Sequence, residues 1–173
     1  MTKTLLPGSK APALSLPLVG GGTWTLADEA PDTMTMIVVY RGLHCPICNG
    51  YLNQLQDRLD AFAEAGVSVI AISMDAEDRA TQAQSDWGLE KLRFAYGLTE
   101  AQAREWDLYL TQSIAEKEPE VFAEPGLYWV LPDGTVYLMD IGTMPFARPD
   151  LDLLLSRVGA IAKGYPPRGT YTT

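Results

Sequence analysis

The chain has 173 residues, of which 47% are hydrophobic and 20% are charged, and its formal net charge is −9 with a pI near 4.5. This composition is typical of a globular protein with a sizeable core, and we expect a single domain over residues 1–173. The acidic balance argues against a nucleic-acid partner, because phosphates would be repelled. No apolar run in the sequence is long enough to span a bilayer, so no membrane partner is expected.

The first half of the chain predicts a hairpin and then alternating strands and helices. Residues 12–26 alternate weakly around three consecutive glycines, which is typical of a β-hairpin. Residues 33–41 and 67–73 are rich in β-branched side chains and predict two buried strands. Between them, apolar residues repeat at intervals of three and four from Cys45 to about Ala65, which predicts a helix. Two strands joined in this way should be parallel.

The second half predicts helices around one pair of strands. Charged, irregular residues at 112–125 predict a mobile loop, and Pro132-Asp133-Gly134 predicts a turn between two strands within 126–142. The remaining expected elements are a helix at 76–88, at most a short strand at 92–98, a helix at 99–110 begun by Thr99, and a last helix at 149–164. The whole order predicts an α/β sandwich around a mixed sheet.

The stretch RGLHCPICNGYL, residues 41–52, holds both cysteines of the chain, Cys45 and Cys48, and its only histidine, His44. Three interpretations compete: a metal site, a buried structural pair and a redox dithiol. A zinc site needs four ligands, and this stretch offers three, so a carboxylate would have to supply the fourth; we expect no metal. Two inert, half-buried thiols are the plain structural alternative.

The position of the two cysteines favours the redox dithiol. Cys45 stands where a buried strand leads into a helix, with Pro46 suited to the first helical turn. The unpaired N–H groups and the dipole of that helix should stabilise a thiolate on Cys45. Cys48 follows one turn later on the same face, within reach of a disulfide. Cys45 should therefore attack substrate, and Cys48 should resolve the resulting adduct.

Two neighbouring side chains could tune the dithiol. His44, when protonated, would raise the thiolate fraction of Cys45, or it could merely fill the loop. Arg41 ends the strand four residues before Cys45. It could stabilise an anionic thiolate, or it could be an ordinary surface arginine.

Four stretches resemble one known family, and together they cover most of the chain. They are PGSKAPALSLPLVGGGTWTL, IVVYRGLHCPICNGYLNQL, VIAISMDAED and EPGLYWVLPDGTVYL. They resemble the redoxins of the alkyl hydroperoxide reductase/thiol-specific antioxidant (AhpC/TSA) group, the peroxiredoxin-like antioxidant proteins. The resemblance implies a thioredoxin-like fold, with a central mixed β-sheet flanked by helices and an N-terminal β-hairpin. It also implies that Pro125 is a cis-proline packed against the dithiol and that the backbone of Glu124 pairs with substrate.

The sequence also departs from this family at places that matter for peroxide chemistry. The peroxiredoxin pattern P-x-x-x-[TS]-x-x-C meets Val38 and Gly42 where it requires Pro and Thr or Ser. The arginine that the family places near the start of a later strand is replaced by Pro125. Both lost groups would polarise peroxide oxygens, so efficient peroxide reduction requires that Arg41 substitute for them. Thioredoxins carry a buried acid before the loop, where this chain has Val39.

The leading prediction is therefore a thiol–disulfide oxidoreductase that uses Cys45 and Cys48. The alternative enzyme is an atypical thiol peroxidase that uses the same cysteines on hydroperoxides, and the alternative of another class is a non-catalytic binding module. We expect a protein or small-molecule disulfide, or a hydroperoxide, as substrate, an external thiol such as thioredoxin or glutathione as reductant, and no cofactor. The N-terminal segment is a poor signal peptide, so a cytoplasmic location is expected. The C-terminal tail and the apolar stretch 127–131 could serve a homodimer interface.

Overall fold

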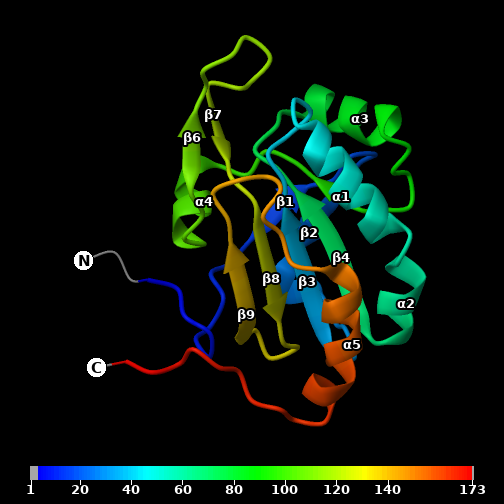
Figure 1. Ribbon diagram of the computed structural model, residues 1–173, viewed down its shortest axis with the longest axis vertical. Helices are drawn as coiled ribbons and strands as arrows, with labels where there is room; N and C mark the ends of the chain where they lie inside the picture. The colour runs from blue at the N-terminus through cyan, green and yellow to red at the C-terminus, as the bar shows by residue number, and fades with distance from the viewer. Residues whose placement is uncertain (1–3, 173) are drawn as a thin grey trace.

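The computed structural model describes residues 4–172, and its centre is a mixed five-stranded sheet with strand order β5–β4–β3–β8–β9 (Figure 1). β3 runs parallel to β4, with Met34 opposite Val67 and Val39 opposite Ile72, which confirms the predicted parallel pair. β3 also pairs antiparallel with β8. The strands of this sheet are β3 (Met34–Val39), β4 (Val67–Ile72), β5 (Phe94–Ala95), β8 (Gly126–Val130) and β9 (Val136–Ile141).

Helices cover both faces of this sheet. β3 alternates its side chains, so that Met36 and Val38 face one apolar cluster whereas Ile37 and Val39 face the other. Figure 1 shows α1, α2 and α5 on the first face; α4 and a two-stranded hairpin, β1 (Ser15–Pro17) with β2 (Thr23–Thr25), contribute to the second cluster. The α-helices are α1 (Pro46–Gln56), α2 (Leu59–Glu64), α3 (Glu77–Asp86), α4 (Glu100–Glu105) and α5 (Leu151–Ala162).

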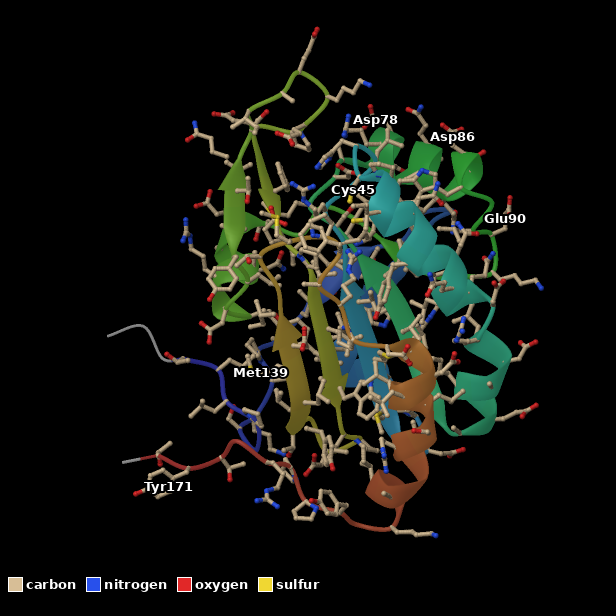
Figure 2. The ribbon with its side chains drawn as sticks, in the orientation of Figure 1. Cys45, Asp78, Asp86, Glu90, Met139 and Tyr171 are labelled. Carbon is tan, nitrogen blue, oxygen red and sulfur yellow. The ribbon has the colours of Figure 1, made fainter. Side chains whose placement is uncertain are left out.

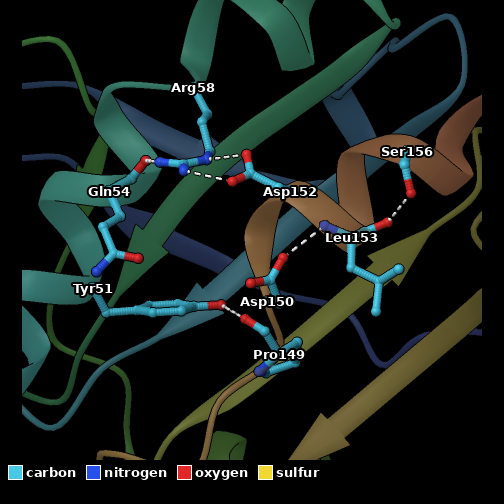
Figure 3. A network of polar contacts seen from close by, with 8 residues as sticks. All are labelled: Tyr51, Gln54, Arg58, Pro149, Asp150, Asp152, Leu153 and Ser156. Carbon is cyan, nitrogen blue, oxygen red and sulfur yellow. Dashed lines mark hydrogen bonds and ion pairs between the residues drawn. The ribbon is translucent and has the colours of Figure 1, made fainter.

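The helix predicted from Cys45 to about Ala65 is in fact two helices, α1 and α2. Arg58 lies outside helical geometry, with φ −108° and ψ 2°, and its N–H donates to the carbonyl of Leu55 rather than Gln54. The guanidinium of Arg58 donates to the Gln54 carbonyl instead, and it also pairs with Asp152 at the start of α5 (Figure 3). The break between α1 and α2 thus coincides with a contact between Arg58 and α5.

The segment from Thr99 to Pro125 differs from its prediction in two ways. Thr99 and Gln102 form a capping box, as the predicted helix start requires, but α4 ends at Glu105 because Asp107 adopts a left-handed conformation with φ 54°. The expected mobile loop at 112–125 is instead a hairpin of β6 (Leu110–Gln112) and β7 (Val121–Ala123), which projects from the top of the molecule in Figure 1. Its strands are short and its tip is charged, so the period-two signal was weak.

The turn at Pro132-Asp133-Gly134 is confirmed, with the N–H of Gly134 donating to the carbonyl of Leu131. α5 begins after Asp150, whose side chain accepts the N–H of Leu153. Over residues 4–172, no helix combines the length and the apolar character needed to cross a bilayer.

Candidate active site

Cys45 lies at the start of α1, at the end of the sheet where β3 leads into the loop 40–44 (Figure 2). Gly42 gives this loop its shape, because its φ of 130° is a conformation that side chains rarely adopt. The buried carboxylate of Asp75 accepts the N–H of Leu43 at 2.8 Å and is paired with Arg79. A Cβ on Gly42 would meet this carboxylate at 2.7 Å. The loop therefore excludes a hydroxyl-bearing residue at position 42.

Cys45 is the N-cap residue of α1. Its Sγ accepts the backbone N–H of Cys48 at 3.3 Å, one of the free donors of the first helical turn. The pKa of Cys45 is lowered to about 6, first by a hydrogen bond from the Cys48 thiol and then by that backbone N–H and the Arg41 guanidinium, against the opposing effect of burial. The arrangement agrees with the predicted activated thiolate, and Cys45 is only 1% exposed.

Cys48 lies one turn along α1 and is fully buried. Burial raises the pKa of its thiol, and the thiolate of Cys45 beside it raises that pKa further. The two opposite shifts favour the reduced state in which Cys45 is ionised and Cys48 carries the proton. The Nη2 of Arg148 donates to the Sγ of Cys48 at 3.2 Å.

Arg41 is held beside Cys45 by the projecting hairpin. Its Nε lies 3.1 Å from Oε2 of Glu124, and its guanidinium lies 4.9 Å from the ring centre of Phe122 in β7. The other carboxylate oxygen of Glu124 accepts the hydroxyl of Thr111 in β6. These contacts hold Arg41 in the site rather than free on the surface, and from there its guanidinium adds to the lowering of the pKa of Cys45.

The structure corrects the expected conformation at Pro125. No peptide bond over residues 4–172 is cis, so Pro125 follows a trans bond, the form that X–Pro bonds intrinsically prefer. The N–H of Glu124 donates to the carbonyl of Tyr109, and the carbonyl of Pro125 accepts the N–H of Gly142. Both residues are buried between strands. A substrate-binding role for Glu124 and Pro125 stays a prediction.

His44 packs its ring edge against Phe122, 4.6 Å between ring centres. Burial, and then the nearby charge of Arg41, lower the pKa of His44, so the imidazole is neutral near pH 7. Of the two roles left open for His44, filling the loop fits these contacts better than adding positive charge. Between residues 4 and 172, no three His, Cys, Asp or Glu side chains gather as a set of metal ligands.

Sequence reasoning missed Arg148 and Asp75 as parts of this site. Arg148 lies 100 residues from Cys48 in the chain, and no spacing links the two. The signal for Asp75 was the end of VIAISMDAED, but only the fold brings its carboxylate to the loop before Cys45.

Residues 7–139 match the family model described as the AhpC/TSA family. The chain belongs to the AhpC/TSA family. Two Mycobacterium tuberculosis proteins that carry a provisional peroxiredoxin name are 34% identical to it over 91 residues, a match that covers 51% of this chain and 57% of each relative. The alignment thus reaches little more than half the length of these relatives.

Solved structures show the same fold at low sequence identity. Peroxidoxin BcpB from Mycobacterium tuberculosis is 16% identical with a TM-score of 0.74, over 91% of this chain and 99% of that one. The reduced 2-Cys peroxiredoxin of Plasmodium vivax is 16% identical with a TM-score of 0.75, over 92% of this chain and 83% of that one. Peroxiredoxin Q of Xanthomonas campestris is 21% identical with a TM-score of 0.69, over 86% of this chain and 91% of that one. The thioredoxin-like fold is therefore confirmed, and membership of the AhpC/TSA family supports a thiol-dependent redox function.

Proposed function

We propose that the protein is a thiol-dependent oxidoreductase that cycles between the Cys45/Cys48 dithiol and an intramolecular disulfide. One observation carries the proposal: Cys45 caps the start of α1 and accepts the N–H of Cys48, and its pKa is lowered by the Cys48 thiol, by that N–H and by Arg41, with the second thiol one turn away. An activated nucleophile with an adjacent resolving thiol is the arrangement that two-step thiol chemistry requires. A non-catalytic binding module would have no need to lower the pKa of Cys45.

We propose a small hydroperoxide as the substrate, and two observations support this choice over a disulfide. Cys45 is 1% exposed, and a small peroxide oxygen reaches such a sulfur more easily than a protein disulfide does. Arg41 also lies near enough to Cys45 to contribute to its lowered pKa, and we infer that it donates to the leaving oxygen in place of the family's missing groups. The names of the relatives agree with this chemistry.

The proposed reaction has two chemical steps and a reductive step. The Cys45 thiolate attacks the terminal oxygen of ROOH, the O–O bond breaks, and the alkoxide takes a proton and leaves as ROH. Cys45 is now a sulfenic acid, and the sulfur of Cys48 displaces its oxygen as water to form the disulfide. Two external thiols then reduce the disulfide, and they end as a disulfide themselves.

A disulfide substrate remains the second candidate, because one observation favours it. Gly42 stands where the peroxiredoxin pattern has a hydroxyl, and the Asp75 carboxylate leaves no room there for any side chain. Attack on a disulfide places the developing charge on sulfur, which needs less help from donors, since a thiol is a stronger acid than an alcohol.

A stopped-flow comparison tests the proposal and separates the two candidates. Reduced protein is mixed with hydrogen peroxide or with oxidised glutathione, and each rate is divided by that of the free cysteine thiolate with the same reagent. We expect an acceleration of at least about 10²-fold for peroxide and a smaller one for the disulfide. The reverse order would favour the second candidate. No acceleration with either reagent would contradict the proposed function.

A further inference from the structure

Arg148 has a contact set that the nucleophilic role of Cys45 does not explain. It lies in the loop between β9 and α5, and its Nη2 donates to the Sγ of Cys48 at 3.2 Å. Its Nη1 donates to the carbonyl of Pro145 at 3.0 Å, and the guanidinium lies 4.8 Å from the ring centre of Tyr51. The guanidinium is thus fixed from three directions, with one N–H aimed at the buried sulfur.

The loop that carries Arg148 is itself fastened to α1. The hydroxyl of Tyr51 donates to the carbonyl of Pro149 at 2.8 Å, as Figure 3 shows. Tyr51 therefore holds both the guanidinium, through its ring, and the backbone next to it, through its hydroxyl. Such a double hold fixes the guanidinium and lowers the entropy lost when it binds a charged group.

The guanidinium of Arg148 forms no ion pair with a carboxylate of the described residues. Within the described residues, no Asp or Glu oxygen lies within 4.0 Å of its guanidinium, whereas Arg41 is paired with Glu124. A neutral thiol is a weak acceptor and gains little from a guanidinium. A thiolate at the same place would gain a charge-assisted hydrogen bond. The contact with Cys48 is therefore better suited to the ionised sulfur than to the protonated one.

We propose that Arg148 is a catalytic residue of the resolving step, where it stabilises Cys48 as the thiolate that attacks oxidised Cys45. This role rests on the proposed function and divides the site between two arginines. Arg41 serves the first attack at Cys45, and Arg148 serves the second attack by Cys48.

The change of charge at Cys45 explains the timing. In the reduced protein the Cys45 thiolate disfavours a negative charge on Cys48. It also accepts a hydrogen bond from the Cys48 thiol, which keeps that thiol protonated. Once Cys45 carries the oxygen or sulfur of a substrate, that negative charge is gone, and Arg148 remains. Arg148 and Cys45 are the charged groups that shift the pKa of Cys48. The Tyr40 hydroxyl is held neutral by burial, and the nearby carboxylates of Asp140 and Asp150 add to the effect of burial in raising the pKa of Tyr51. Cys48 then ionises more easily when it must attack.

A substrate-independent assay isolates the resolving step. Methyl methanethiosulfonate transfers its methylthio group to the Cys45 thiolate and releases methanesulfinate, which leaves a neutral mixed disulfide. The Cys48 thiolate then attacks the sulfur of Cys45 and releases methanethiolate, which forms the Cys45–Cys48 disulfide. Rapid acid quenching and intact-mass spectrometry follow both steps across a pH series. The variants are Arg148→Gln, Arg148→Lys and, as a control for loss of positive charge, Arg157→Gln on the exposed face of α5.

We expect Arg148→Gln to slow decay of the mixed disulfide by about 10- to 100-fold, since a hydrogen bond to a charged group is lost, and to move the pH midpoint of that decay upward. Methylthiolation of Cys45 should keep its rate. Arg148→Lys should fall between wild type and Arg148→Gln, and Arg157→Gln should match wild type. If Arg148→Gln does not fold, the same pH midpoint is read from Arg148→Lys.

Two results would overturn the proposal for Arg148. Decay at the wild-type rate would show that the guanidinium is not used, and slower decay with an unchanged pH midpoint would show a purely structural role. Failure of wild type to form the adduct at Cys45 at all is a different result. It would contradict the proposed function itself, and the role of Arg148 would fall with it.

Discussion

The Nε of Arg41 lies 3.1 Å from Oε2 of Glu124, and this ion pair ties the loop before Cys45 to the end of β7. The side chain of Glu124 is 6% exposed and that of Arg41 is 20% exposed, so the pair is largely withdrawn from water. We propose that Glu124 positions this guanidinium, which adds to the effect of the Cys48 thiol and N–H in lowering the pKa of Cys45.

Breaking this pair should destabilise the fold. We expect Glu124→Ala to lower the free energy of unfolding by about 2 to 3 kcal/mol, somewhat less than for a fully buried pair because Arg41 is partly exposed. Urea denaturation of the reduced protein measures the loss. Glu116→Ala, an exposed acid at the tip of the same hairpin, should change the stability by less than about 0.5 kcal/mol. Equal losses of unfolding free energy in the two variants would show that the Arg41–Glu124 pair does not stabilise the fold more than an exposed acid does.

Arg41 should matter more for chemistry than for stability. We expect Arg41→Gln to raise the pKa of Cys45 above its value of about 6 and to slow the reaction of the remaining thiolate with peroxide by about 10²- to 10³-fold. Stopped-flow measurement at a pH where Cys45 is ionised separates the two effects. Arg104→Gln, at an exposed position of α4, is the control and should keep both values. An unchanged rate with peroxide in Arg41→Gln would contradict the proposal that Arg41 donates to the leaving oxygen.

Alkylation of Cys45 by iodoacetamide should rise with pH around a midpoint of about 6 in the reduced protein. A free thiol has a pKa of about 8.5, so the folded state favours the thiolate. The resulting stabilisation is complete above the unfolded pKa and is lost as pH falls through about 6. The stability gap between wild type and Cys45→Ser should therefore shrink as the pH is lowered through that range. A midpoint at or above 8.5 would contradict an activated Cys45.

Restoring the family's hydroxyl at position 42 should fail. We expect Gly42→Thr to cost about 1 to 3 kcal/mol of stability, because φ is 130° and a Cβ would lie 2.7 Å from the Asp75 carboxylate. It should also react no faster with peroxide. Gly50→Ala is the matched control in α1, where a Cβ meets nothing within 4 Å, and it should stabilise the protein slightly. A stable Gly42→Thr variant with faster peroxide turnover would contradict this account of the loop.

The sequence predicted the elements whose signals are local. The β-branched runs of β3 and β4 and the Pro-Asp-Gly turn carry their own periodicity or turn chemistry, and each was found where expected. The placement of Cys45 and Cys48 at the start of one helix was predicted for the same reason and is confirmed, whereas their redox role stays a prediction.

The errors and omissions come from contacts distant in the chain. The break between α1 and α2 falls at Arg58, which pairs with Asp152 on α5, and no residue near Arg58 in sequence predicts this contact. The site is completed in the same way, because Asp75 and Arg148 reach it only through the order of the strands. Contacts of this kind follow from tertiary packing rather than from local propensity.

The central claim is that Cys45 attacks and Cys48 resolves within one chain, and intact-mass spectrometry under non-reducing conditions tests it most directly. Reduced protein is treated with one equivalent of hydrogen peroxide, alongside the Cys45→Ser and Cys48→Ser variants. We expect wild type to become a monomer with a Cys45–Cys48 disulfide, Cys48→Ser to stop at a trappable sulfenic acid on Cys45, and Cys45→Ser to stay unmodified. Oxidation first at Cys48, or oxidised wild type found only as a disulfide-linked dimer, would contradict the claim.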